Sequence, residues 1–243
     1  MSITTALALG NRFRDPEGDY IVLASESLVR ANILRQHLNI QNVLMMRSGF
    51  PEDLDKSTFP EVGEYVKATA DGKARMVAEA IFGADNDEKR KALLSLLKNP
   101  FDSLPSTLDI NNIKVVIGAD TVCNCGGEIF EKPADENGAR MQLAAYQSHN
   151  PEFVTGVSIY YRPIGFTKPA CCFFDKTVVK FQRMTADDIQ AYLNTQQYVG
   201  TSGSIRVTGF AESLVERMEG SYTNVVGLPA QKVSSHLCKI ING

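Results

Sequence analysis

The sequence predicts an α/β fold. Short apolar segments rich in β-branched residues alternate along the chain with segments in which apolar residues recur every three or four positions. Clusters of Gly, Pro, Asn and Ser separate these segments and indicate turns. No internal repeat and no linker divides the chain. Strands that alternate with helices are typical of a sheet covered by helices, so we expect one such domain.

The composition is that of a globular protein, and it argues against several classes of partner. The chain has 243 residues, of which 44% are hydrophobic and 22% charged, with a formal net charge of −3. This balance gives no reason to expect a nucleic-acid or membrane partner. No apolar run approaches the ~20 residues that span a bilayer. The first residues lack a basic segment, so we interpret 1–19 as an N-terminal extension and not as a signal peptide.

Cysteines and known motifs narrow the chemistry further. The five cysteines are odd in number and show no zinc-binding spacing, which favours reduced thiols and a reducing compartment. We therefore predict a cytoplasmic protein. Neither the phosphate-binding G-x-x-x-x-G-K-[ST] loop nor the G-x-S-x-G elbow of α/β-hydrolases occurs.

The first strand and helix form a candidate anion site. We expect a strand at 20–24, then Ser25, and then a helix with Arg30 in its first turn. A helix N-terminus presents backbone N–H groups to an anion, and an arginine there strengthens the site. The same residues also fit an ordinary capped helix with a solvated arginine. The predicted apolar face of the helix comprises Leu28, Ala31, Leu34 and Leu38.

An acid-rich loop and a long helix follow a short predicted strand at 43–46. The loop holds Glu52, Asp53 and Asp55, which could supply an oxygen ligand for Mg²⁺ or form a turn with a capping Asp. The helix is expected at 62–81, with Lys73 beside its apolar side. That side comprises Val66, Ala70, Val77 and Ile81.

Residues 83–112 break the pattern, and we interpret them as an insertion. A charged run at 85–91 precedes a short amphipathic helix with leucines at 93–97. Asn and Pro residues then mark loops up to residue 112.

Asp120 is the strongest single candidate for catalysis. It follows an apolar, β-branched run from 113, and we expect it just past a buried strand, where open α/β sheets gather their ligands. Lys132 comes twelve residues later, beside Pro133. An acid and a nearby lysine at one sheet edge suit metal-assisted phosphate chemistry. A solvated acid in a loop is the alternative from this pattern alone.

The C-terminal half continues the alternation. A Gly126-Gly127 pair between two short strands predicts a hairpin, and a helix is expected at 135–146 with Ala139, Leu143 and Tyr146 inward. The remaining predicted elements are strands at 153–161, 171–174, 177–181 and 214–216, a helix at 186–194, a turn at 221–229, and a final helix from about 230.

Five stretches in order and spacing resemble the Maf family, the septum-formation and nucleotide-pyrophosphatase family. They are 23–30 (L-A-S-E-S-L-V-R), 48–52 (S-G-F-P-E), 116–121 (V-I-G-A-D-T) with 131–133 (E-K-P), 154–157 (V-T-G-V), and 220–229 (G-S-Y-T-N-V-V-G-L-P). The resemblance implies a domain over 20–243. It also implies an elongated mixed sheet flanked by helices, with a deep central cleft of the Maf and ITPase-like kind.

The resemblance also implies an activity and a set of site residues. Such proteins hydrolyse nucleoside triphosphates between the α and β phosphates, use Mg²⁺ or Mn²⁺, and are often homodimers. Glu52 and Asp120 are then the metal ligands, and Asp120 also matches the general base. The other matched positions are Ser25 and Arg30 for phosphate binding, Lys73 in the following helix, and Lys132 as the phosphate lysine.

The segment 201–208 (T-S-G-S-I-R-V-T) departs from the family pattern and leaves base preference open. The pyrimidine-triphosphate branch resembles K-A-G-x-Y-G-I-Q here, and the 7-methyl-GTP branch resembles A-G-S-F-K-S-E. Arg206 brings the segment closer to the second branch, whereas the G-A-D-T motif resembles the first. Arg206 and Thr208 are candidate substrate-binding residues, although Thr208 is shorter than the usual Gln or Glu. We therefore expect a nucleoside triphosphate substrate, either standard, such as UTP or dTTP, or modified, such as 7-methyl-GTP.

Three functional hypotheses therefore stand. The first is a nucleoside triphosphate pyrophosphatase. The second is a nucleotide-binding regulator of the same fold with weakened turnover, which the altered 201–208 segment motivates. The third is an interaction protein that docks through the 83–112 insertion. Retention of all the charged site positions favours the enzyme.

Overall fold

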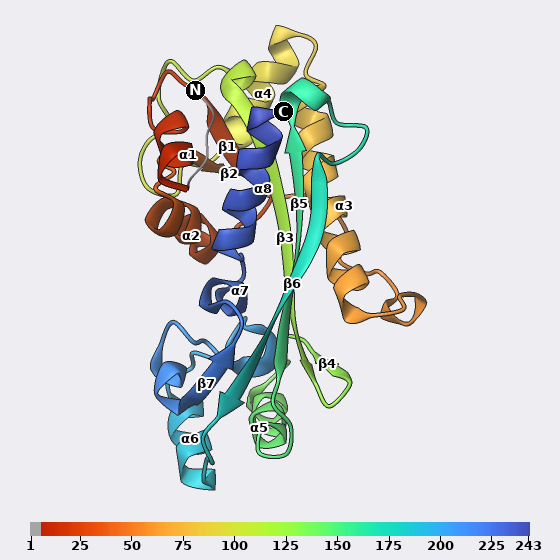
Figure 1. The fold of residues 1–243 in the computed structure, drawn as a ribbon, viewed down its shortest axis with the longest axis vertical. Coiled ribbons are helices and arrows are strands. Elements are labelled where there is room, and N and C mark those ends of the chain that lie inside the picture. Colours follow the sequence, from red (N-terminus) through yellow and green to blue (C-terminus); the bar gives the residue numbers. More distant parts are fainter. Residues whose placement is uncertain (1–5) are drawn as a thin grey trace. The chain divides into compact units, whose positions relative to one another are not determined.

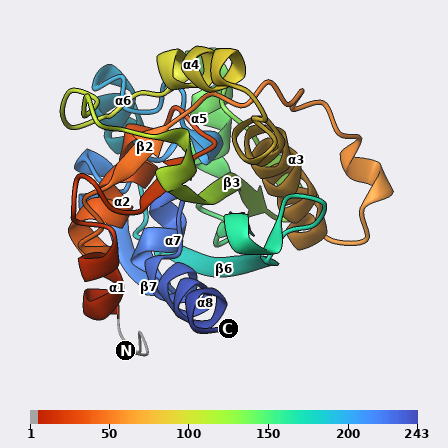
Figure 2. The same cartoon turned by 90° about the horizontal axis from the view of Figure 1, so that it is seen from above.

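A computed structural model of the chain describes residues 6–243 and contains a seven-stranded sheet with helices around it (Figures 1 and 2). The strand order is β2-β1-β3-β5-β6-β7, and β4 pairs with β3. Strand β1 runs parallel to β2 and β3, whereas β4 and β7 pair antiparallel with β3 and β6. The predictions of an α/β fold and of a mixed sheet are confirmed. The deep cleft that the resemblance implies stays a prediction.

The elements agree with most of the predicted ranges. The strands are β1 (Tyr20–Leu23), β2 (Val43–Met45), β3 (Ile113–Cys125), β4 (Glu128–Phe130), β5 (Glu152–Tyr161), β6 (Cys171–Phe181) and β7 (Val215–Glu219). The helices are α1 (Ala6–Arg12), α2 (Leu28–Leu38), α3 (Val62–Phe82), α4 (Asp87–Leu96), α5 (Glu136–Ala145), α6 (Ala186–Asn194), α7 (Tyr222–Val226) and α8 (Ala230–Asn242).

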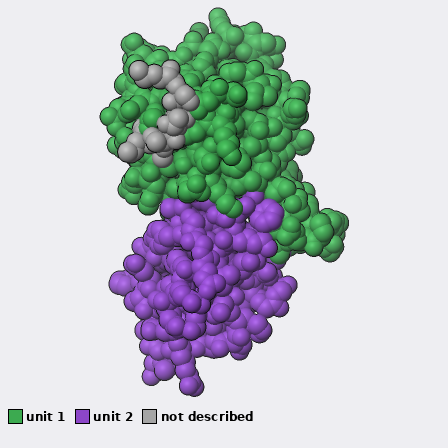
Figure 3. Space-filling model, viewed as in Figure 1, with its two compact units in different colours: residues 1–120, 156–173, 230–243 green, residues 121–155, 174–229 purple. Residues whose placement is uncertain are grey.

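The chain divides into two compact units, which are coloured separately in Figure 3. The first comprises residues up to 120, 156–173 and 230–243. The second comprises residues 121–155 and 174–229. Strands β3, β5 and β6 each contribute residues to both units, because the divisions fall within these strands.

The first unit has its own apolar core. All four residues of β1 and all three of β2 are buried, as a strand covered on both faces requires. The predicted apolar side of α3 is confirmed, since Val66, Ala70, Val77 and Ile81 are all buried.

Parts of residues 83–112 also belong to this core. Leu97, Leu108 and Ile110 are buried, and Lys98 pairs with Met45 of β2 through two backbone hydrogen bonds of 2.8 and 2.9 Å. Burial of one leucine or isoleucine side chain stabilises a fold by about 1.5–3 kcal/mol.

Residues ahead of β1 pack against the same unit. Leu9 and Phe13 are fully buried, and the Phe13 carbonyl accepts hydrogen bonds from the backbone N–H groups of Gln41 and Asn42. Arg12 forms an ion pair of 2.7 Å with Asp19. Residues 1–5 of the predicted extension lie outside the described part of the chain.

The second unit contains α5 and α6 together with residues 121–125 of β3, 152–155 of β5 and 174–181 of β6. The Tyr146 ring stacks on Phe181 with centroids 5.1 Å apart. Gly126 and Gly127 have φ of 61° and 87°, the left-handed values that a type I′ hairpin needs, so the hairpin prediction is confirmed. Helix α6 begins with a full capping box between Thr185 and Asp188.

Three strand and turn predictions were wrong. Strand β3 continues to Cys125, so Asp120 lies inside the strand and not past its end. Strand β6 is continuous across the polar pair at 175–176, because the backbone ladder does not depend on side-chain polarity. The predicted turn at 221–229 contains α7, whose first turn is capped where Ser221 Oγ accepts the Asn224 N–H.

Two helix predictions also need correction. Leu28 is 51% exposed and the adjacent Val29 is 40% exposed, so the buried part of α2 begins only after them, at Ala31. Helix α4 includes most of the charged run, since the Asn86 side chain accepts the Lys89 N–H and caps the helix ahead of it. Within residues 6–243, no helix combines the length and apolar character needed to cross a bilayer.

Candidate functional site

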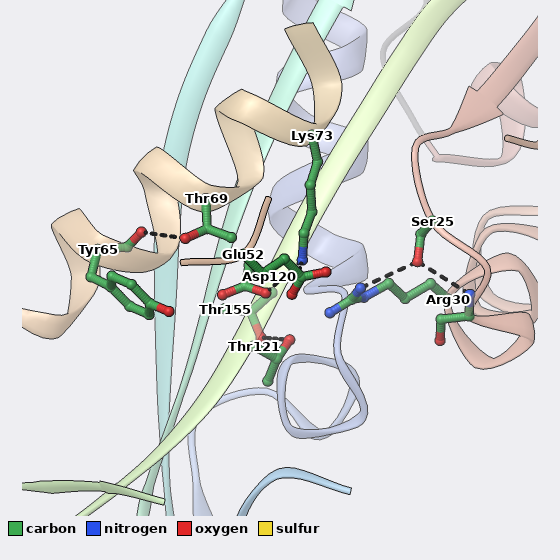
Figure 4. A network of polar contacts seen from close by, with 10 residues as sticks. Ser25, Arg30, Glu52, Tyr65, Thr69, Lys73, Asp120, Thr121 and Thr155 are labelled. Carbon is green, nitrogen blue, oxygen red and sulfur yellow. Dashed lines mark hydrogen bonds and ion pairs between the residues drawn. The ribbon is translucent and has the colours of Figure 1, made fainter. Parts of the chain in front are cut away.

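Three charged side chains from separate segments of the first unit meet at the Lys73 ammonium (Figure 4). Lys73 Nζ donates to Asp120 Oδ1 at 2.9 Å and lies 2.8 Å from Glu52 Oε2. The Lys73 and Asp120 side chains are only 8% and 12% exposed, whereas Glu52 is 61% exposed. A buried lysine needs such partners, because an unpaired buried charge is strongly unfavourable.

A close helix–strand contact brings Lys73 to Asp120. A Cβ atom on Gly118 of β3 would lie 2.3 Å from the Ala70 carbonyl oxygen and 2.8 Å from the Ala74 Cβ, so only glycine allows α3 this near. Side chains alternate along a strand, and Gly118 and Asp120 therefore share the face that α3 covers. The strand and the helix thus place the Asp120 carboxylate opposite the Lys73 ammonium group.

A second close contact positions Glu52. The Phe50 ring packs on Gly72 of α3, where a Cβ atom would lie 2.3 Å from a ring carbon. This contact holds the loop after β2 against the helix one residue before Lys73.

The neighbouring Asp55 has a different role. It accepts the Ser57 N–H and hydroxyl at 2.9 and 2.7 Å, and these bonds lower the pKa of its carboxyl group. The capping interpretation of the acid loop therefore holds for Asp55, whereas the interpretation of Glu52 as a metal ligand stays a prediction.

The predicted anion site at the start of α2 differs in detail from expectation. Ser27 occupies the N-cap position, but its side chain makes no capping hydrogen bond. Ser25 Oγ instead accepts the Ser27 N–H at 3.2 Å and Arg30 Nη1 at 3.4 Å (Figure 4). Burial lowers the pKa of the Arg30 guanidinium, and the fields of Asp120 and Glu52 oppose this effect.

The local charges balance. Arg30 and Lys73 contribute two positive charges, and Glu52 and Asp120 contribute two negative charges, so the formal sum is zero. A triphosphate brings negative charge that the two cations can bind, while the two carboxylates can hold a cation or accept a proton.

Lys132, Arg206 and Thr208 belong to the second unit, and their side chains are exposed. The Arg206 backbone N–H donates to the Tyr192 hydroxyl at 3.0 Å. The Glu131 carbonyl, next to Lys132, accepts the Gly203 N–H and Gln142 Nε2. The roles expected of these three residues stay predictions.

Sequence reasoning assigned no role to a buried polar network that begins next to Asp120. Thr121 and Thr155 share a hydroxyl contact of 3.0 Å, and Thr155 Oγ1 donates to the Asn224 carbonyl at 3.0 Å. The Asn224 side chain donates to the Phe153 carbonyl and to Thr177. Thr155 and Asn224 lie in two of the five stretches that resemble the family, at 154–157 and 220–229. Their place in these stretches was the sequence signal that could have pointed to the network.

The Glu52 and Asp120 carboxylates suit a metal ion that also binds substrate phosphates better than a metal ion held by protein side chains alone. No set of three or more His, Cys, Asp or Glu side chains within residues 6–243 is arranged to hold a metal ion. Mg²⁺ is commonly held by one or two carboxylates together with water and substrate phosphates. That Glu52 and Asp120 are these two carboxylates stays a prediction.

Comparison with known proteins agrees with the family resemblance. A model of the Maf-like protein family matches residues 20–240. The dTTP/UTP pyrophosphatase of Citrifermentans bemidjiense is 31% identical over 224 residues, which cover 91% of this chain and 92% of that protein. That of Clostridium botulinum (strain Okra / Type B1) is 29% identical, covering 90% and 96%. That of Thermosipho africanus is 34% identical, covering 62% and 87%.

Proposed function

Because the chain belongs to the Maf family, we propose that it is a nucleoside triphosphate pyrophosphatase. It hydrolyses the bond between the α and β phosphates and releases a monophosphate and pyrophosphate. The observation that carries the proposal is Lys73 held between Asp120 and Glu52, with Arg30 alongside. This set supports the proposal, because hydrolysis of a phosphoanhydride needs both positive charge for the phosphates and a group that activates water.

Each residue has a role in this proposal. Arg30, Lys73 and Lys132 neutralise the charge that develops on the phosphates, and one well-placed contact of this kind contributes about 3–4 kcal/mol in the transition state. Asp120 orients the attacking water and accepts its proton. Ser25, Arg206 and Thr208 contact the substrate. A divalent cation, Mg²⁺ or Mn²⁺, held by Glu52 and Asp120 would supply Lewis-acid stabilisation of the phosphate oxygens.

We infer that dTTP and UTP are the preferred substrates, ahead of 7-methyl-GTP. The names of the curated relatives support this choice, as does the G-A-D-T motif at 118–121. We further propose that the protein acts in the cytoplasm as a homodimer. The odd number of cysteines and their lack of a zinc-binding spacing support a reducing compartment, and sedimentation velocity would measure the oligomeric state.

Turnover of a nucleotide panel tests the activity. We expect pyrophosphate and monophosphate in equal amounts from dTTP and UTP with Mg²⁺ or Mn²⁺, and less from 7-methyl-GTP. Asp120→Asn should lower the rate by about 10²–10⁴-fold, the range for loss of a general base. Asp87→Asn, at an exposed acid of α4, is the control. Binding without any turnover by the wild type would favour the regulator, and an unchanged rate in Asp120→Asn would remove that residue from catalysis.

A further inference from the structure

We propose that the Glu52–Asp120 carboxylate pair takes a divalent cation only together with nucleotide, because Lys73 occupies the pair when nucleotide is absent. The inference deepens the proposed function and rests on it for the identity of the second ligand. The part that concerns metal alone depends only on the geometry of the three side chains.

Lys73 satisfies both carboxylates with a single ammonium group. Its Nζ lies 2.9 Å from Asp120 Oδ1 and 2.8 Å from Glu52 Oε2, distances typical of strong charge-assisted hydrogen bonds. The Lys73 side chain is only 8% exposed, so water competes little for its ammonium group. A metal ion bound between the same oxygens would displace the ammonium or stand next to it.

Charge balance disfavours metal binding on its own. Glu52 and Asp120 are already neutralised by Lys73 and by the field of Arg30. A divalent ion would therefore meet a cluster with no net negative charge and a buried like charge nearby. In a partly desolvated site, one such like-charge contact weakens binding by about tenfold or more.

A bound triphosphate changes this balance. Its phosphate oxygens offer new partners to Lys73, whose flexible stem lets the ammonium turn away from the carboxylates. The carboxylates are then released for the metal, and the phosphates add ligands of their own. By linkage, metal and nucleotide must strengthen each other's binding by the same factor.

Titration of the purified protein with Mn²⁺ in the absence of nucleotide tests the first step. Free Mn²⁺ is measured by electron paramagnetic resonance. Lys73→Met should bind Mn²⁺ about tenfold more tightly than the wild type, whereas Lys73→Arg, which keeps the charge, should stay weak. Lys67→Met is the matched control, since Lys67 lies on the same helix and pairs with Glu64. An increase below about threefold in Lys73→Met would overturn the proposal.

Two further measurements locate the gained Mn²⁺ binding and check that the variants are folded. In the double variant Lys73→Met/Asp120→Asn the gained Mn²⁺ binding should disappear, and its persistence would put the metal elsewhere and overturn the proposal. Circular dichroism checks folding, and Lys73→Gln replaces the Met variant if that variant is unfolded.

Thermal melting reads out the coupling to nucleotide. Mn²⁺ alone should raise the melting temperature of Lys73→Met but not of the wild type. With α,β-methylene-UTP present, Mn²⁺ should raise that of the wild type as well. An equal rise in the wild type with and without the analogue would contradict the coupling. The proposed activity is scored separately by turnover, so a wild type that hydrolyses nothing can still pass the Mn²⁺ test.

Discussion

Lys73 connects two carboxylates that differ greatly in exposure. Asp120 is 12% exposed and lies inside a strand, whereas Glu52 is 61% exposed and lies in a loop. Loss of a partner from a buried ion pair is costly, but exposed pairs contribute about 0–1 kcal/mol. We therefore expect the contact of Lys73 with Asp120 to contribute more to stability than its contact with Glu52.

At the residue scale, we expect Glu52→Gln to separate these two effects. Turnover of UTP should fall by at least about tenfold, because the variant loses a partner of Lys73 and the carboxylate that we propose as a metal ligand. The melting temperature should change little, since the side chain is mostly solvated. Steady-state kinetics and thermal melting measure the two quantities. Asp53→Asn, one residue along the same loop, should leave both unchanged, and a large loss of stability in Glu52→Gln would contradict this account.

At the scale of elements, α3 is the part that organises the site. It approaches β3 at Gly118 and β5 at Gly156, where added Cβ atoms would meet helix backbone at 2.3 Å. On another side of the helix, Asp71 accepts hydrogen bonds from Ser158 and Tyr160 of β5 at 2.7 and 3.1 Å. These contacts fix the helix on the sheet and so fix the distance from Lys73 to Asp120.

We expect Gly118→Ala to disturb both stability and activity. The new methyl group would meet a backbone carbonyl that cannot rotate away, and overpacking of this kind typically costs about 1–3 kcal/mol. Displacement of α3 should also lower UTP turnover. Urea unfolding and kinetics measure the two effects. Gly138→Ala in α5 is the control: its nearest neighbour would be 3.5 Å away, so its stability should be equal or slightly higher. Normal activity in Gly118→Ala would show that the close contact does not set the site.

At the scale of the whole molecule, the second unit buries groups that must stay protonated. Burial raises the pKa of the Cys123 thiol from 9.0 to about 12, and burial raises that of the adjacent Tyr146 hydroxyl well above 10.0. Above pH 9 the unfolded chain loses the Cys123 proton while the folded protein keeps it. The unfolded state then binds fewer protons, so the free energy of unfolding falls as pH rises.

We therefore expect alkaline destabilisation between about pH 9 and 12 that depends on Cys123. Urea unfolding at pH 7 and at several values above 9 would measure it. Cys123→Ala should show a smaller loss over the same range, because its contribution to the pH dependence is gone. Parallel curves for the variant and the wild type would contradict the assignment.

Local patterns predicted most elements, for reasons visible in particular residues. The period-3.6 positions Val66, Ala70, Val77 and Ile81 gave α3, and Gly126-Gly127 gave the hairpin. The errors arose where tertiary partners override a local signal. Asp120 looked like the end of a strand because it is charged, yet Lys73 compensates its charge and the strand continues.

The sequence by itself determined the fold class, the family and the residue types of the candidate site, because periodicity and ordered motifs are local properties of the chain. Only the tertiary structure decided which of these residues meet. It showed that Lys73 binds Glu52 and Asp120 together, that Asp55 caps a turn, and that Ser25 contacts Arg30. The contacts of Lys73 depend on how closely α3 packs on β3 and the loop after β2 packs on α3. Such distances are set by shape complementarity between segments far apart in sequence.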